Sequence, residues 1–212
     1  MARNGWKWAG AAATAALGSA AIYYWRERAL EQPEYALEIE DCQFSVRRYQ
    51  SFLSAVVTVT GERESAQRSG FIRLADYIFA KNRPGEKITM TAPVMEQRVG
   101  RGGGTADAAQ ASGALPGDWR IRFMMPRAFS EASLPQPPEG IAIERIAERR
   151  IAAVRFAGSA REGTLHRRED DLRRWMEREG LQPIGDFEYA FYNSPSIPPF
   201  LRRNEVLVPI AG

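Results

Sequence analysis

Residues 87–94 of the chain read Lys87-Ile88-Thr89-Met90-Thr91-Ala92-Pro93-Val94. Threonines alternate here with apolar side chains, which is the period of a strand with one apolar face. Pro93 has no amide hydrogen and a fixed φ, so the strand predicted over residues 86–96 must end or change partner there. Apart from ordinary threonines, the segment holds no candidate acid, base or nucleophile. It therefore predicts architecture, with two similar halves of the chain on either side.

The composition is that of a globular protein with one good core. The chain has 212 residues, 44% of them hydrophobic and 26% charged, with a net charge of +3. Basic residues are mixed with acidic ones, as in Arg167-Arg168-Glu169-Asp170-Asp171, which is typical of a solvated face and argues against nucleic-acid binding. Cys42 is the only cysteine, so the chain can form neither an internal disulfide nor a CxxC metal site.

Residues 1–30 differ from the rest. No charge occurs from Trp8 to Trp25, and aromatic residues stand at both ends of this run. These features predict a single-pass membrane anchor through residues 6–25, with the following domain on the periplasmic side. The alternative is a signal peptide cleaved at the small residues 18–21, which would leave a periplasmic or secreted protein.

The first half of the following domain predicts strands and then a helix. Residues 35–40, 43–49 and 53–60 have strand patterns, and residues 64–80 have helical spacing. The helix has a core stripe and, beside it, a second stripe that widens its apolar sector; the second stripe is Arg68, Ile72, Ala75 and Phe79. Either the helix lies deep in a sheet, or the second stripe lines a ligand pocket with Arg68 at its mouth.

The second half repeats the first. Residues 46–61 align without gaps on residues 143–158, and a second helix follows that ends at Gly180. Residues 99–118, rich in Gly, Ala and Ser, predict a flexible loop, and residues 119–125 predict a strand. We therefore expect an α+β domain over 34–212 with pseudo-twofold halves 34–126 and 139–210. Its antiparallel strands would curl into a barrel flanked by two helices.

Several motifs resemble the SOUL heme-binding protein family over roughly residues 34–210. They are Phe44-Ser45-Val46-Arg47-Arg48-Tyr49, the 87–94 segment, Tyr192-Asn193-Ser194-Pro195 and Arg202-Arg203-Asn204-Glu205-Val206. The resemblance implies a duplicated, distorted eight-stranded antiparallel β-barrel with two helices, here in a bacterial, membrane-anchored member. It also implies reversible binding of heme or another tetrapyrrole. The same architecture resembles the effector-binding domains of bacterial multidrug-responsive regulators.

The resemblance also implies where a ligand binds. Some members of the family use a histidine at the position of Arg48, which cannot ligate iron, so we expect no histidine axial ligand. Other members hold heme in an apolar cleft beside the first helix, with basic residues near the propionates. In this sequence the expected ligand-binding residues are Arg68, Phe71, Ile72, Ala75, Phe79, Leu201 and Arg202. An arginine at the rim suits a carboxylate, because its fork pairs with both oxygens.

Three further residues admit two interpretations each. His166, the only histidine, projects away from the apolar stripe of the second helix, which favours an exposed residue over a functional one. Cys42 shares parity with Phe44 and Val46, which predicts a buried apolar role, with iron ligation as the alternative. Glu205 is either an exposed or fold-stabilising carboxylate, or a buried acid that faces lipophilic cations and needs a partner.

These observations predict a membrane-tethered, non-catalytic protein that binds heme or another tetrapyrrole. The alternatives are a structural or protein-interaction domain that has lost heme binding, and a binder of lipophilic cations. One histidine and one cysteine supply neither a catalytic triad nor a metal cluster, so we expect neither an enzyme nor a metal site.

Overall fold

A computed structural model describes residues 25–99 and 118–212. Nine strands and two long helices follow one another in these residues. In chain order they are β1 (Tyr35–Asp41), β2 (Phe44–Tyr49), β3 (Phe52–Val59), α2 (Arg63–Ile78), β4 (Val94–Arg98), β5 (Trp119–Met124), β6 (Ala142–Ile146), β7 (Arg149–Phe156), α4 (Glu162–Glu179), β8 (Glu188–Phe191), the short 3-10 helix η1 (Pro199–Leu201) and β9 (Asn204–Pro209). The predicted loop at 99–118 lies outside the described residues, apart from its two end residues.

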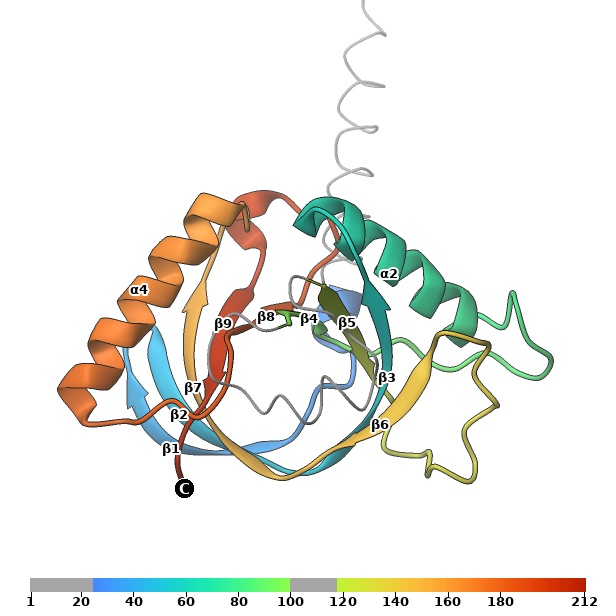
Figure 1. The fold of residues 1–212 in the computed structure, drawn as a ribbon, viewed down its shortest axis with the longest axis horizontal. Helices are drawn as coiled ribbons and strands as arrows, with labels where there is room; N and C mark the ends of the chain where they lie inside the picture. Colours follow the sequence, from blue (N-terminus) through green and yellow to red (C-terminus); the bar gives the residue numbers. More distant parts are fainter. Residues whose placement is uncertain (1–24, 100–117) are drawn as a thin grey trace, which may run out of the picture.

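All nine strands form one antiparallel sheet that curls into a half-barrel (Figure 1). The strand order is β1-β2-β7-β9-β8-β4-β5-β3-β6. The expected distorted eight-stranded barrel with two helices is therefore corrected in two respects, while its antiparallel strands and its two helices are confirmed. β1 adds a ninth strand through its hairpin with β2, and β1 and β6 form two free edges. The strand pattern at 35–40 had predicted this extra strand, which the resemblance alone did not.

The strand order has an internal symmetry once β1 is set aside. Exchanging β2, β3, β4 and β5 for β6, β7, β8 and β9 leaves the order unchanged when it is read from the other end. β4 and β8 pair with each other at the centre. A duplicated chain would produce this arrangement; the sequence repeat itself stays a prediction.

The two helices lie on the outer side of the curl, where they cover the main apolar core (Figure 1). α2 packs on β3 and β5, so closely that a Cβ at Gly70 would stand 2.5 Å from a side-chain carbon of Ile121. α4 packs on β7 and β9, with the ring of Trp175 stacked on Phe44 at 5.2 Å. The left-handed conformation of Gly180, with φ of 67°, ends α4 as the sequence predicted.

The 87–94 segment differs from the prediction. The strand begins only at Val94, directly after a cis Ala92–Pro93 bond, and the residues before it are irregular. Their hydrogen bonds go elsewhere: the Ala92 amide donates to the Glu31 carbonyl at 2.9 Å, and the Thr91 hydroxyl to the Met124 carbonyl at 2.7 Å. The segment thus joins the N-terminal residues of the domain to the sheet.

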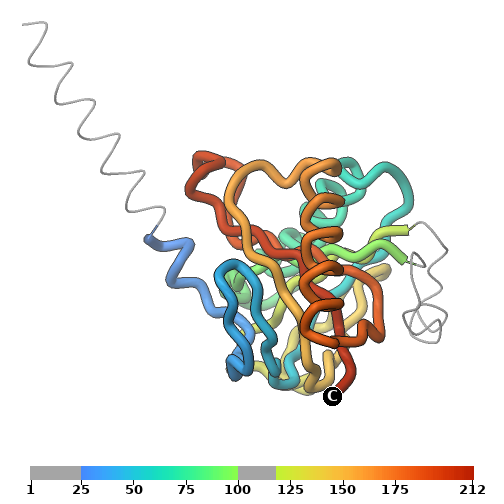
Figure 2. Tube along the Cα trace, turned by 90° about the vertical axis from the view of Figure 1, so that its left-hand side faces the viewer, coloured from blue at the N-terminus to red at the C-terminus, as the bar shows by residue number. Residues whose placement is uncertain are grey.

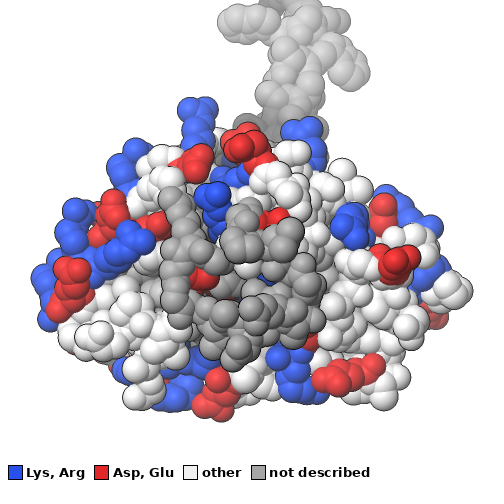
Figure 3. Space-filling model, viewed as in Figure 1, with Lys and Arg blue, Asp and Glu red and all other residues white. Residues whose placement is uncertain are grey.

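Charges of both signs alternate along the solvent side of α4, seen at the left in Figure 3. Arg168 and Arg174 pair with Asp171 at 3.0 and 2.7 Å. This agrees with the solvated face predicted from the sequence. None of the helices in residues 25–99 and 118–212 has the length and apolar character of a membrane span. The predicted anchor at 6–25 falls almost entirely outside these residues.

Candidate functional site

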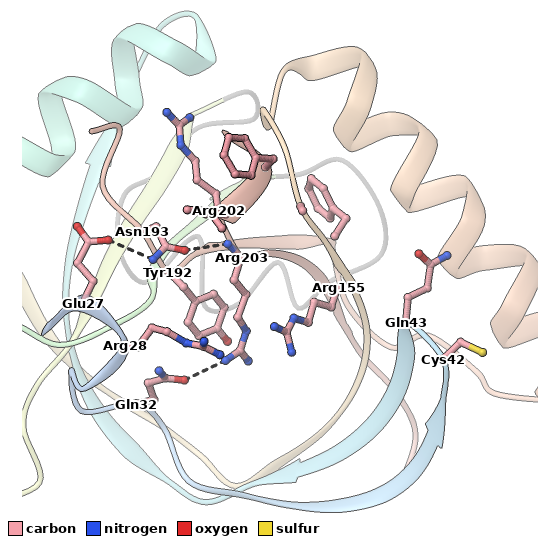
Figure 4. A pocket seen from close by; sticks show the side chains of 14 residues that line it. Glu27, Arg28, Gln32, Cys42, Gln43, Arg155, Tyr192, Asn193, Arg202 and Arg203 are labelled. Carbon is pink, nitrogen blue, oxygen red and sulfur yellow. Dashed lines mark hydrogen bonds between the residues drawn. The ribbon is translucent and has the colours of Figure 1, made fainter. Parts of the chain in front are cut away.

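A pocket of about 720 Å³ opens at one end of the hollow of the half-barrel. Four parts of the chain line it: residues 27–32, the β1–β2 turn, the end of β7 and the residues between β8 and β9. Four arginines belong to the lining, namely Arg28, Arg155, Arg202 and Arg203. Glu27 is the acidic residue of the lining. We call this site the arginine pocket (Figure 4).

The guanidinium groups of the arginine pocket differ in how they are held. Arg155 points into the pocket from β7 and has no side-chain partner among the described residues (Figure 4). Arg202 donates to the carbonyls of Ile197 and Pro195, both at 2.7 Å. These carbonyls orient the guanidinium without removing its positive charge. The lining can therefore attract an anion.

Arg203 connects the lining to a buried carboxylate beneath it. Glu205 is fully buried and accepts hydrogen bonds from Arg203 at 2.8 and 3.0 Å. Arg47 pairs with both of its oxygens at 2.8 and 3.2 Å, and the Tyr192 hydroxyl donates to it at 2.9 Å. The guanidinium of Arg203 also lies 3.7 Å from the centre of the Tyr192 ring. Because both oxygens of Glu205 accept hydrogen bonds, this network is held rigidly. We call Glu205, Arg47, Arg203, Tyr49 and Tyr192 the floor of the arginine pocket.

The floor holds fixed charges and neutral phenols near pH 7. Burial alone would raise the pKa of Glu205, but Arg47 and Arg203 outweigh it and hold that pKa below its ordinary value. Burial and the adjacent Glu205 raise the pKa of Tyr49 to about 12 and that of Tyr192 well above its ordinary value. These shifts favour the ionised form of Glu205 and the protonated forms of the two phenols near pH 7.

A second buried ion cluster lies on the same face of the sheet. Glu188 contacts Arg149 at 2.6 and 2.9 Å and Arg122 at 2.8 Å. Burial opposes ionisation of Glu188, but the two guanidiniums prevail and lower its pKa to about 2. With its counter-ions in place, this cluster is part of the fold.

Glu96 is the buried acid with the opposite behaviour. It lies on the helix-covered face of β4, with one oxygen 2.5 Å from Arg63 and the other without a hydrogen bond among the described residues. Burial outweighs Arg63 and raises the pKa of Glu96 to about 7. It does not line the arginine pocket.

The structure places the predicted ligand-binding residues on two elements. Leu201 and Arg202 line the arginine pocket, whereas the five residues from the first helix do not. On α2, Arg68 is exposed, Phe71 and Ile72 are 39% and 52% exposed, and Ala75 is buried. Phe79 caps the helix and is half-buried. Phe71, from the core stripe, packs edge-on against Phe123, and the buried Ala75 shows that part of the second stripe also contributes to the core.

The other candidates are placed as follows. Arg48 is half-exposed and pairs with Glu38 at 2.8 Å. His166 is 39% exposed, with Nε2 3.9 Å from Glu162. The prediction that Cys42 is buried was wrong: the residue is exposed and lines the arginine pocket. β1 ends before it and β2 begins after it, so Cys42 belongs to a hairpin turn with φ of 53°, where strand parity does not hold. Glu205 is buried and has the partner that burial demands.

Sequence reasoning missed three of the lining arginines and Tyr192. Arg155 follows four apolar residues of β7, and its register places it opposite Glu205. The pairing of Arg155 with Glu205 could have identified Arg155 from the sequence, if β7 and β9 had been placed side by side in this register. Arg28 could not have been found, because it joins the pocket only through the docking of residues 25–32. In the described residues, no group of three or more His, Cys, Asp or Glu side chains could hold a metal ion.

Comparisons with known proteins agree on family and fold. Residues 30–209 match the SOUL heme-binding protein family. Heme-binding protein 1 of Mus musculus is 27% identical over 169 residues, which cover 79% of this chain and 84% of that protein.

Solved structures extend the likeness to the fold. An uncharacterized conserved protein from Listeria innocua has a TM-score of 0.55 at 12% identity, covering 80% of this chain and 92% of the other. The EcmrR C-terminal domain has a TM-score of 0.54 at 13% identity, covering 80% and 97%. A hydrolase from Listeria innocua has a TM-score of 0.52 at 13% identity, covering 82% and 94%. At such identities these likenesses concern the fold alone.

Proposed function

The chain belongs to the SOUL heme-binding protein family, and we propose that it is a non-catalytic protein that binds heme or a related tetrapyrrole in the arginine pocket. The observation that carries the proposal is the charge of the lining. Four arginines surround the pocket, and Arg155 has no partner among the described residues. A tetrapyrrole offers carboxylates to such groups and an apolar ring to the remaining lining, including Phe156, Phe200 and Leu201.

The size of the arginine pocket supports the proposal. Pockets for small molecules and cofactors have volumes of roughly 300–1,000 Å³, and this one has about 720 Å³. Apolar burial contributes on the order of 25 cal/mol per Å², so one porphyrin face can supply several kcal/mol before association entropy is subtracted. The ligand can therefore be held by burial and charge without a bond to iron.

The side chains of the lining argue for binding without a metal bond. No histidine lines the pocket in the described part of the chain. Tyr192 donates its hydroxyl to Glu205, and its raised pKa keeps it protonated. Cys42 is the remaining side chain of a type that ligates heme iron. We expect protoporphyrin without iron to bind about as well as hemin.

A second location for the ring is the apolar surface of α2. Phe71 and Ile72 are exposed there, and the family resemblance places the ligand beside this helix. A carboxylate in that location would meet Arg68. Different substitutions should weaken porphyrin binding in the two cases, so mutagenesis can distinguish the arginine pocket from the surface of α2.

The test is an absorbance titration of the full chain with hemin and with protoporphyrin. Arg155→Ala and Arg203→Ala should each weaken binding by the cost of a lost desolvated partner, roughly 1 to 3 kcal/mol or about 5- to 150-fold. Arg167→Ala, an exposed arginine of α4, is the matched control and should bind normally. His166→Ala should also be silent. If Ile72→Asp abolishes binding and the pocket variants do not, the ligand lies on α2. Loss of the hemin spectrum in Cys42→Ser alone would show that iron is ligated.

The charge of the arginine pocket disfavours the alternative of lipophilic cations. A buried acid could have bound a cation, but Glu205 is already neutralised by Arg47 and Arg203. A protein-interaction role without any ligand would be supported if neither porphyrin binds. We further propose that residues 6–25 tether the domain to a membrane, with the domain on the periplasmic side.

A further inference from the structure

Two segments that contribute to the lining of the arginine pocket, residues 25–28 and 200–202, carry large apolar side chains that face solvent, and we call these segments the rim. Trp25 is 68% exposed, Phe200 74% and Leu201 41%. Phe200 and Leu201 lie on η1, and Glu27, two residues after Trp25, lines the same pocket. Exposed aromatic side chains at two points of one rim mark a surface that another phase or molecule covers.

The same rim is cationic. Arg26 and Arg28 follow Trp25 and are exposed, and Arg202 follows Leu201. The carboxylate of Glu27 accepts hydrogen bonds from the Asn193 side chain at 3.1 Å and from a backbone amide at 3.2 Å. This acid is thus engaged in holding the chain, and arginines stand beside the exposed aromatic residues in both segments of the rim.

Residues 25–32 are fixed to the body of the domain. Besides the contacts of Glu27, the Glu31 carbonyl accepts from the Ala92 amide and the Gln32 side chain accepts from Arg203. Figure 2 shows the first described residues and η1 on the same side of the body. The sequence before Trp25 is uncharged back to Trp8. The chain therefore enters this domain at the rim of the pocket, from an uncharged segment.

We propose that this rim docks on an anionic lipid bilayer. Trp25, Phe200 and Leu201 enter the interface, while Arg26, Arg28 and Arg202 face the phosphates of the headgroups. The proposal rests on the membrane tether proposed above. It adds that the arginine pocket opens toward the bilayer. An amphiphile with an apolar ring and carboxylates, which collects at the same interface, then passes between bilayer and pocket without crossing bulk water.

The test measures the depth of two positions with one label. In the full chain carrying Cys42→Ser, which removes the native thiol, either Phe200→Cys or Ile184→Cys is labelled with an environment-sensitive fluorophore. Ile184 is the matched control, an apolar residue 57% exposed. The Ile184 amide donates to the Pro209 carbonyl at the last residue of β9. The first residue of this six-residue strand follows η1 closely in the chain, and the two ends of the strand are about 17 Å apart. The vesicles contain phosphatidylcholine and phosphatidylglycerol in equal parts, with brominated acyl chains as quenchers.

The label at position 200 should be quenched several-fold more than the label at position 184. Vesicles of phosphatidylcholine alone should give less quenching at position 200, because their surface has no net negative charge to attract the arginines. Equal quenching at both positions, no quenching at either, or failure of the chain to sediment with vesicles would overturn the docking. Porphyrin titration of the unlabelled wild type reads out the arginine pocket separately, so the failure of one proposal is distinguishable from failure of the other.

Discussion

Removing the charge of Glu205 should destabilise the protein more than any exposed charge does. Glu205→Gln keeps the shape of the side chain but leaves Arg47 and Arg203 without their buried counter-ion. Arg47 is 6% exposed and Glu205 fully buried, so water cannot replace the lost contacts. Breaking a buried ion pair by removing one partner costs about 3–5 kcal/mol. At about 2–4 °C per kcal/mol for a domain of this size, Tm should fall by roughly 6–20 °C.

The assay is thermal and urea unfolding followed by circular dichroism at pH 7. Glu131→Gln is the matched control, because its partner Arg145 and the acid itself are both more than half exposed. Such a surface pair contributes about 0–1 kcal/mol. A loss in Glu205→Gln no larger than that in Glu131→Gln would refute the reasoning that the floor of the arginine pocket is held by a saturated carboxylate.

Three more outcomes are expected. Glu188 has a folded-state pKa of about 2, so the ionised Glu188 stabilises the fold above its unfolded pKa near 4.5, and this stabilisation is lost as pH falls toward 2. The difference in unfolding free energy between wild type and Glu188→Gln, on the order of 3 kcal/mol at neutral pH, should therefore shrink between pH 4.5 and pH 2. A difference that stayed constant over this range would contradict the assignment. Gly70→Ala should cost about 1–3 kcal/mol because its methyl group would collide with Ile121, whereas Gly163→Ala, whose methyl group meets only the tip of Arg167 at 3.8 Å, should be neutral or stabilising by urea unfolding. The full chain should stay with membranes after an alkaline wash because of its uncharged run at 8–25, and a mature chain shortened within this run would identify a signal peptide instead.

Much of the fold follows from patterns of local sequence. Strand alternation, helical spacing and Gly180 predicted the elements that the structure contains, because periodicity reports which side chains face the core. The start of β4 was predicted too early. Before Pro93 the Ala92 amide donates to the Glu31 carbonyl and the Thr91 hydroxyl to the Met124 carbonyl, so these residues do not continue the ladder of β4. Contacts between residues so far apart in the chain leave no pattern in the sequence around either residue.

The candidate site was only partly predictable, for a related reason. Leu201 and Arg202 were expected near the ligand and line the arginine pocket. Arg155 and Arg28 join them only when β7 and residues 25–32 are brought to one end of the half-barrel. The wide apolar sector predicted for α2 is divided in the structure: Ala75 is buried and Phe71 packs on Phe123, whereas Ile72 is exposed. Spacing on one helix cannot distinguish a face that lines a cavity from one that packs on a sheet.

The most direct test of the proposed function compares protoporphyrin with its dimethyl ester. The ester keeps the ring and loses both carboxylates, so it isolates the contribution of the arginines. For the wild type we predict that the ester binds weaker by roughly tenfold or more, which is about 1.4 kcal/mol, and that this gap narrows in Arg155→Ala. Equal affinities for the two porphyrins in fluorescence titrations of the wild type would contradict a site organised around the arginine pocket.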